Sequence, residues 1–324
     1  MNDVLRQYGS YMQAKKTNTM KTTIIFLLIF FGLTSNIFAF PISPRPLRQL
    51  VIESQYIIVG YVVNTYEKKN DKDDWGSRVA RIAVLENLQG KISKDTIEIE
   101  FDPNMICPTP DRYFDSTYVI SFINKNKKNR KFYTHALNYG AKTLKKEEIE
   151  IYKKRILEIQ QILKITDTEK QRSETVEWLI KCAENETTRW EGTFELRPKS
   201  NFMSYYSRTE KQDFKSIINA EQKNRLKNAL LTSQKMVDFG LVDLVYKDNE
   251  TQIDDFLFTK LKNLKKDKYW TADEFMNRLK HKNTSKDSKE MNEIMEEFDK
   301  FQFEYEKEEE LKKTIEKFIR LIEE

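Results

Sequence analysis

The chain has few of the residues that build metal centres and disulfide frameworks. Its 324 residues include only two cysteines, Cys107 and Cys182, and two histidines, His135 and His281. Two cysteines exclude a disulfide-stapled scaffold and any cysteine-rich zinc site. Two histidines leave little for metal binding or for acid–base chemistry. The sequence therefore predicts no metal ligands and no cofactor.

Sequence motifs of the common enzyme classes are also missing. The chain has no Gly-x-Ser-x-Gly elbow, no His-Glu-x-x-His, no Walker loop and no dinucleotide-binding glycine fingerprint. With 51 acidic residues, adjacent carboxylates do not identify a general acid and base. No catalytic residue is assigned, and we expect a protein that is not an enzyme. An enzyme with an unfamiliar site stays open as an alternative.

The segment nearest to a metal-binding loop is 70–76. Asp71 and Asp73 occupy alternate positions, as ligands do in calcium loops. Trp75 then stands where the third ligand should be, and no glutamate follows at the proper distance. A solvated hairpin loop is therefore the preferred interpretation.

One long apolar run is present, and it follows an internal methionine. Met20 and a lysine precede an apolar core at 24–33, and the small residue Ala39 follows a polar step at 34–36. This pattern is typical of a secretory signal peptide. We expect residues 1–39 to be that signal, with translation starting at Met20 and the mature chain at Phe40.

A membrane anchor is the alternative for the same run. A helix that spans a bilayer needs about 20 apolar residues, roughly twice the length of this core. The sequence therefore predicts an exported protein, periplasmic or secreted, with no membrane span after signal cleavage. No later segment approaches spanning length.

The composition of the mature part indicates a folded protein with a highly charged surface. Charged residues make up 33% of the chain, mean hydropathy is −0.70, and aromatics reach 12%, enough to build small cores. The net charge of +5 is spread over 56 basic and 51 acidic residues. That is a mild bias and not the signature of a polyanion-binding protein. Together with export, it argues against nucleic acid as a partner.

Residues 48–143 carry the pattern of short β-strands. We expect strands at 56–63, 79–85, 96–101, 118–123 and 131–135. The runs are β-branched and aromatic, and the third alternates strictly between apolar and polar residues. Gly60 interrupts the first run and could mark a bulge or a barrel bend. Short strands joined by polar turns favour a small barrel or sandwich.

Helical periodicity begins after residue 144. Ile149, Tyr152, Ile156, Ile159 and Leu163 fall on one helical face. The expected organisation is an N-terminal segment (40–47), the barrel (48–143), a connecting helix (144–165), an α-helical region (166–281), and a linker with a C-terminal amphipathic helix (282–324).

Local signals refine the helical region. Asn219 with Gln222, and Thr271 with Glu274, predict capping boxes. The stretch 186–206 shows no clear period, and we expect an ordered loop there. No internal repeat of fixed period is present, which argues against a solenoid.

The last apolar pattern runs from Met291 to Ile322 and predicts one amphipathic helix. Its spacing slips between Tyr305 and Leu311, through the charged run 306–310. A continuous coiled coil would not tolerate this slip without local unwinding. Packing of the helix on its own domain is therefore favoured over a partner surface.

The strand block also resembles a known family. The residues that carry the likeness are the apolar run 54–63 with its glycine and two valines, the strand end 84–90, the alternating strand 96–101, the turn 107–110 and the strand 118–123. This segment is similar to the netrin-like module of the tissue-inhibitor-of-metalloproteinase superfamily, an OB-type barrel, as found in exported bacterial proteins. The resemblance implies a small antiparallel OB-like β-barrel. Together with the helical periodicity after residue 144, it predicts an α+β fold, with the barrel followed by an α-helical C-terminal region.

The resemblance does not carry the inhibitory activity with it. Inhibition in that superfamily uses a mature N-terminal cysteine, whereas the expected N-terminus here is Phe40. A metalloprotease inhibitor therefore stays an alternative only. Residues 240–279 also resemble the paired helices of armadillo- or HEAT-like repeats, although one pair is too little to name a family.

Two features carry site predictions. Cys107 and Cys182 could pair after export, which would contribute roughly 4 kcal/mol on the chain-entropy model; the alternative for Cys182 is an ordinary buried thiol. A basic loop, which OB-type barrels can use to contact ligands, contains Lys125, Lys127, Lys128, Arg130 and Lys131. Such a loop can also simply protect a strand edge. The leading hypothesis is an exported, non-catalytic binding protein whose partner is an unidentified protein or envelope component.

Overall fold

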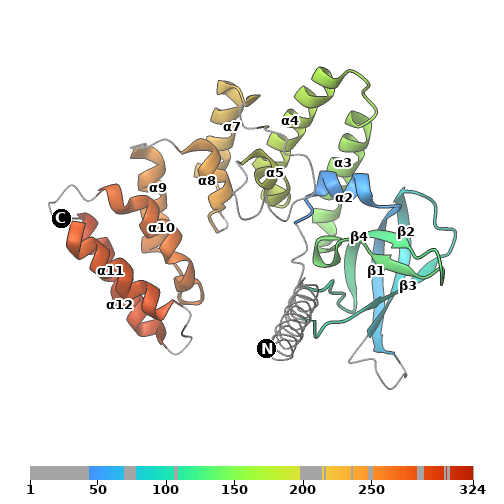
Figure 1. Ribbon diagram of the computed structural model, residues 1–324, viewed down its shortest axis with the longest axis horizontal. Helices are drawn as coiled ribbons and strands as arrows, with labels where there is room; N and C mark the ends of the chain where they lie inside the picture. Colours follow the sequence, from blue (N-terminus) through green and yellow to red (C-terminus); the bar gives the residue numbers. More distant parts are fainter. Residues whose placement is uncertain are drawn as a thin grey trace, which may run out of the picture. The chain divides into compact units, whose positions relative to one another are not determined.

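The computed structural model describes residues 44–68, 78–105, 109–197, 214, 217–234, 236–246, 251–282, 288–302, 304 and 307–323. All of them belong to one compact unit, Ser43–Glu324. The predicted signal peptide, the loop 70–76 and Cys107 lie outside the described residues. The fold is α+β: an OB-like β-barrel followed by an α-helical region (Figure 1).

Five strands close the barrel. They are β1 (Tyr56–Glu67), β2 (Arg78–Gln89), β3 (Thr96–Phe101), β4 (Thr117–Lys125) and β5 (Phe132–Thr134). Their order is β1-β2-β3-β5-β4, and β4 pairs back onto β1. All neighbours run antiparallel except β3 and β5, which are parallel. A sixth strand, β6 (Ala141–Leu144), extends the sheet beyond β4. The predicted fold class is confirmed, but a closed barrel alone does not identify a netrin-like module, so that assignment stays a prediction.

Gly60 marks a bulge, as its place in the first strand predicts. The register between β1 and β2 shifts after Val59, which leaves Leu85 without a partner on β1. A Cβ atom at Gly60 would lie 2.5 Å from Cγ2 of Ile82. Glycine is therefore required here by the close approach of the neighbouring strand.

The barrel strands bury both of their faces. Alternate residues such as Ile58 and Ile82 fill the barrel interior. The intervening residues, including Ile57 and Phe122, join a second core cluster that contains the helices. This explains why β4 is buried from Val119 to Asn124 without alternation, since a strand covered on both sides has no solvent-facing side.

Two helices cover the outer face of the barrel. α3 (Lys146–Ile162) buries Ile149, Tyr152, Ile156 and Ile159, as predicted, and it packs on α2, β2, β4 and α4. α2 (Leu47–Glu53) was not predicted, because residues 48–53 were assigned to the barrel. Its N-terminus follows Pro46 and has no side-chain cap of its own.

The remaining helices form successive packed pairs. These are α4 (Thr168–Glu184) with α5 (Arg189–Leu196), α7 (Ala220–Leu231) with α8 (Phe239–Val245), α9 (Thr251–Lys262) with α10 (Ala272–Leu279), and α11 (Ser288–Phe301) with α12 (Glu308–Glu323). Short 3₁₀ segments lie at Leu137–Tyr139, Lys266–Thr271 and Lys280–Lys282. α7 packs on α4, α8 on α5, and α11 on α10, as in solenoids. The missing sequence period therefore did not exclude stacked helical pairs. No helix among the described segments is long and apolar enough to cross a membrane.

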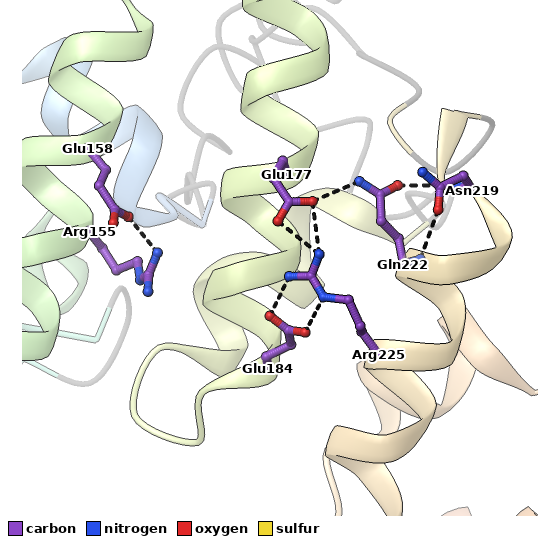
Figure 2. Close-up of polar contacts among 7 residues, drawn as sticks. All are labelled: Arg155, Glu158, Glu177, Glu184, Asn219, Gln222 and Arg225. Carbon is purple, nitrogen blue, oxygen red and sulfur yellow. Dashed lines mark hydrogen bonds and ion pairs between the residues drawn. The ribbon is translucent and has the colours of Figure 1, made fainter.

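Helices α4 and α7 pack against each other, and their contact includes a network of polar side chains (Figure 2). Arg225 of α7 donates to both oxygens of Glu184, at 2.6 and 2.8 Å, and to both oxygens of Glu177, at 2.9 and 3.1 Å. Gln222 also donates to Glu177, at 3.0 Å. Because Gln222 and Asn219 form the predicted capping box, the N-terminus of α7 is tied directly to α4.

Helix α5 lies in the stretch that we expected to be a loop. Its buried residues include Arg189, Glu191, Thr193 and Glu195 as well as Gly192. A helix whose buried face is polar shows no apolar period, which is why the pattern missed it. The expected loop is therefore wrong over Arg189–Leu196.

The C-terminal segment forms two helices rather than the single one expected. Helix α11 ends at Phe301 and helix α12 begins at Glu308, close to the slip in apolar spacing that the sequence shows. α11 and α12 pack against each other, and Lys317 forms an ion pair with Glu297 at 2.7 Å. Packing on the chain itself is thus confirmed. The capping box at Thr271 is wrong, because its hydroxyl donates to the Lys268 carbonyl instead.

Candidate functional site

A groove of about 480 Å³ lies on the barrel between the β2–β3 hairpin and the β4–β5 loop. Its cationic lining residues are Arg81, Lys91, Lys94, Lys125, Arg130 and Lys131. Two carboxylates, Glu98 and Glu100, and two aromatic rings, Tyr56 and Phe132, complete the part of the lining that carries chemistry. The groove therefore combines a surplus of positive charge with aromatic surface.

The β2–β3 hairpin supplies half of these cations. Arg81 stands opposite Glu98 in the antiparallel register. The connection turns at Gly90, whose φ of +65° favours glycine. Asn87 then holds the connection in place, because its side chain accepts from the Ile92 amide at 3.0 Å and donates to the Ile92 carbonyl at 3.3 Å. The loop that carries Lys91 and Lys94 is thus anchored to β2.

The β4–β5 loop supplies the other half, and its own asparagines shape it. Asn126 accepts from the Lys128 amide at 2.8 Å, and Asn129 accepts from the Lys131 amide at 3.0 Å. The Asn126 amide donates to the Lys131 carbonyl at 2.9 Å. These bonds close the predicted hairpin, with Arg130 at a positive φ of 62°.

The predicted basic loop is only partly in the groove. Lys125, Arg130 and Lys131 line it, whereas Lys127 and Lys128 are not among the lining residues. The cations of the β2–β3 hairpin were missed, because nothing in the local sequence distinguishes them from other surface charges. Only the pairing of β2 with β3, and of β3 with β5, brings them to the basic loop.

Glu100 is the internal partner of two groove cations. Its Oε1 lies 2.5 Å from Lys131 Nζ, and its Oε2 lies 3.2 Å from Lys68 Nζ. The hydrogen bond from Lys131, and that from Lys68, hold the pKa of Glu100 below its ordinary value against the opposing effect of burial. Glu98 instead accepts from the Tyr66 hydroxyl at 3.0 Å. The two carboxylates of β3 are therefore bound in different ways.

Within the part of the chain that the structure describes, several of the groove cations form no ion pair. Lys91, Lys94 and Arg130 are exposed and form no ion pair with another part of the described chain. Nearby, Lys125 Nζ lies 5.2 Å from the centre of the Phe132 ring, which meets the Tyr56 ring edge-on at 5.7 Å. The site thus offers uncompensated positive charge beside two aromatic rings.

The cysteine prediction concerns a different region. Cys182 lies on α4, is fully buried and is bonded to no described cysteine, and this burial raises the pKa of its thiol well above the ordinary value. A buried, protonated thiol is not a reactive one. Because Cys107 lies outside the described residues, the bond between the two cysteines stays a prediction.

A buried polar cluster centred on Glu191 joins the barrel to the helices. Glu191 is 1% exposed and accepts from Lys142 Nζ at 2.8 Å, from the Tyr152 hydroxyl at 3.1 Å and from the Leu47 amide at 2.7 Å. Leu47 is the first residue of α2, so Glu191 provides the cap that this helix lacks locally. The cluster connects α2, β6 and α3 to α5, and we assign it a structural function.

The two histidines are each hydrogen-bonded to a carboxylate. His135 contacts Glu53 at 2.7 Å, and His281 contacts the buried Asp254 at 2.9 Å. Tyr246 donates to the same Asp254 at 3.0 Å. These bonds tie α8 to α9 and to the Lys280–Lys282 segment. Over the part of the chain that the structure describes, no three metal-ligating side chains converge.

Comparison with protein-family models and with curated proteins found no match for this chain. The interpretation of the groove therefore depends on its own residues and on the chemistry that they can support.

Proposed function

We propose that the chain is an exported, non-catalytic binding protein whose barrel groove binds an acidic polysaccharide. The observation that carries the proposal is a groove in which exposed cations that pair with no described carboxylate, Lys91, Lys94 and Arg130 among them, lie beside two aromatic rings. This proposal specifies the envelope component that the sequence left open.

Charge supports an anionic ligand. The whole chain has a net charge of only +5, yet six cations and two carboxylates face this one groove. Concave surfaces lined by one sign of charge concentrate the field and attract oppositely charged ligands. Each hydrogen bond to a charged group is worth about 1.5–3 kcal/mol, so a few contacts would suffice for specific binding.

The position on the barrel supports an extended ligand. OB-type barrels bind oligosaccharides and oligonucleotides on the face of strands 2 and 3 and through the loop between strands 4 and 5. The groove uses β2, β3 and the β4–β5 loop. Export, which the signal peptide predicts, makes a polysaccharide the better candidate of the two.

The test is a titration of the predicted mature chain, residues 40–324, with an oligomer of galacturonic acid. Isothermal calorimetry at low and high salt would give the affinity, with a neutral glucose oligomer of equal length as the control ligand. We expect binding of the acidic oligomer only, and weaker binding at high salt because screening reduces exposed charge interactions.

Matched variants of the chain separate the groove from general charge. The double substitution Lys94→Glu and Arg130→Glu should reduce the affinity at least tenfold. The control Lys127→Glu and Lys128→Glu makes the same change of charge in the basic loop but outside the groove, and should have a small effect. Equal losses in both would refute the groove as the site. Tighter binding of a single-stranded oligonucleotide or of polyglutamate would refute the polysaccharide.

A further inference from the structure

We infer that Glu100 occupies the place of a ligand carboxylate in the groove, so that an acidic ligand binds by displacing Glu100 from Lys131. This inference rests on the proposed function. It assigns Glu100 a specific part in binding: an internal anion that lowers the affinity and that weakly charged ligands cannot displace.

Glu100 and its two cationic partners lie on three separate segments of the barrel. Glu100 lies on β3, Lys131 follows the β4–β5 loop, and Lys68 follows β1. The Lys131 side chain is 56% exposed and that of Glu100 is 37% exposed. Both ends of this ion pair are therefore within reach of a ligand in the groove.

The second partner of Glu100 makes the exchange feasible. If Lys131 turns to a ligand carboxylate, Oε2 of Glu100 keeps its contact with Lys68 at 3.2 Å. No carboxylate is then left without a cation, and Lys131 exchanges one anion for another. Since exposed ion pairs contribute little net free energy, such an exchange has a small cost.

Glu98 provides an internal comparison. It lies two residues from Glu100 on β3 and lines the same groove. Its hydrogen bond comes from the neutral Tyr66 hydroxyl, and no groove lysine pairs with it over the described ranges. Arg81 stands opposite Glu98 on β2 but forms no ion pair with it among the described residues. A ligand therefore has no ion pair to displace at Glu98, although both residues carry the same charge.

The test compares Glu100→Gln with Glu98→Gln by titration with the galacturonic acid oligomer. Each variant removes one negative charge from the groove, so a general electrostatic effect would be equal in both. We expect Glu100→Gln to raise the affinity about fivefold and Glu98→Gln less than twofold. Thermal melts would show that both variants are folded.

A double-mutant cycle identifies the displaced contact. In a Lys131→Gln background, Glu100→Gln should no longer raise the affinity, because the exchanged ion pair is already absent. Equal gains in both single variants would overturn the inference, as would a lower affinity of Glu100→Gln, which would mean that Glu100 positions Lys131 for the ligand. Wild-type binding with no change in Glu100→Gln overturns this inference alone. Absence of binding in the wild type and in every variant overturns the proposed function as well.

Discussion

Replacing Asp111 by asparagine should stabilise the protein above pH 6 and leave it nearly unchanged below pH 4. Asp111 is 4% exposed and accepts a hydrogen bond from the Thr134 hydroxyl, which is itself 2.7 Å from the Tyr113 hydroxyl. Burial raises the pKa of Asp111 from 3.8 to about 6, against the opposing effect of the Thr134 bond. The fold therefore favours the neutral carboxyl.

The size of the effect follows from the two pKa values. Each pKa unit corresponds to about 1.4 kcal/mol, so the change from 3.8 to about 6 corresponds to about 3 kcal/mol. Because the folded-state pKa is raised, this stability is fully present below pH 3.8 and is lost as the pH rises through 6. Asparagine is neutral throughout, and so it removes the loss.

Urea denaturation of both proteins between pH 3.5 and pH 8 would test this. The difference in the free energy of unfolding between Asp111→Asn and wild type should rise by about 3 kcal/mol across that range. The control is Asp95→Asn, which removes one charge from the exposed surface of the same barrel. A difference for Asp111→Asn that stays flat with pH, or that falls as the pH rises, would refute the reasoning.

Two further predictions concern the junction of α5 with its neighbours. In Gly192→Ala the new Cβ would lie 2.3 Å from the Leu179 carbonyl oxygen and 2.5 Å from the Ala183 nitrogen; chemical denaturation should show a loss of about 1–3 kcal/mol. Gly240→Ala should lose less stability, because the nearest atoms to its new Cβ are side-chain atoms, which can move. Equal losses in the two variants would contradict the argument that the fixed α4 backbone causes the clash at Gly192. Glu191→Gln leaves Lys142, whose side chain is only 14% exposed, without its buried carboxylate partner and should cost about 3–5 kcal/mol. Glu86→Gln, which breaks the more exposed pair with Lys153, should cost at most about 1 kcal/mol in the same assay, and a reversed order would contradict the burial argument.

The barrel strands could be predicted because each one carries its signal locally. Alternation in 96–101 and the apolar runs around Ile58 and Ile120 reflect which faces are buried, and Gly60 marks the bulge. Closure of the barrel could not be read in this way. Closure depends on the pairing of β1 with β4 and on the parallel pairing of β3 with β5. The paired residues lie far apart in the chain, and no local sequence pattern identifies them as partners.

In the helical region, too, local periodicity predicted some helices and not their boundaries. The apolar face of α3 was visible, because its buried residues are apolar. The C-terminal pattern was also visible, but it read as one helix, since the two helices α11 and α12 carry similar periods on either side of a charged run. The slip in spacing at 305–311 was the local sign of the break, and the loss of register there is what allows α12 to fold back onto α11.

Helix α5 and the groove show why charged residues are the hardest to interpret from sequence. Glu191 and Glu195 look like ordinary surface charges, yet both are buried, because Lys142, Arg48 and the first amide of α2 come from distant segments to bind them.

The groove cations differ from these glutamates, because most of them are exposed, as their sequence suggests. The sequence does not indicate that six of them line one groove. A buried charge must find a partner inside the chain, whereas an exposed, unpaired one can take its partner from outside. By this criterion the Glu191 cluster holds the fold together, and Lys91, Lys94 and Arg130, which form no ion pair with the described residues, are charges available to the ligand that we propose.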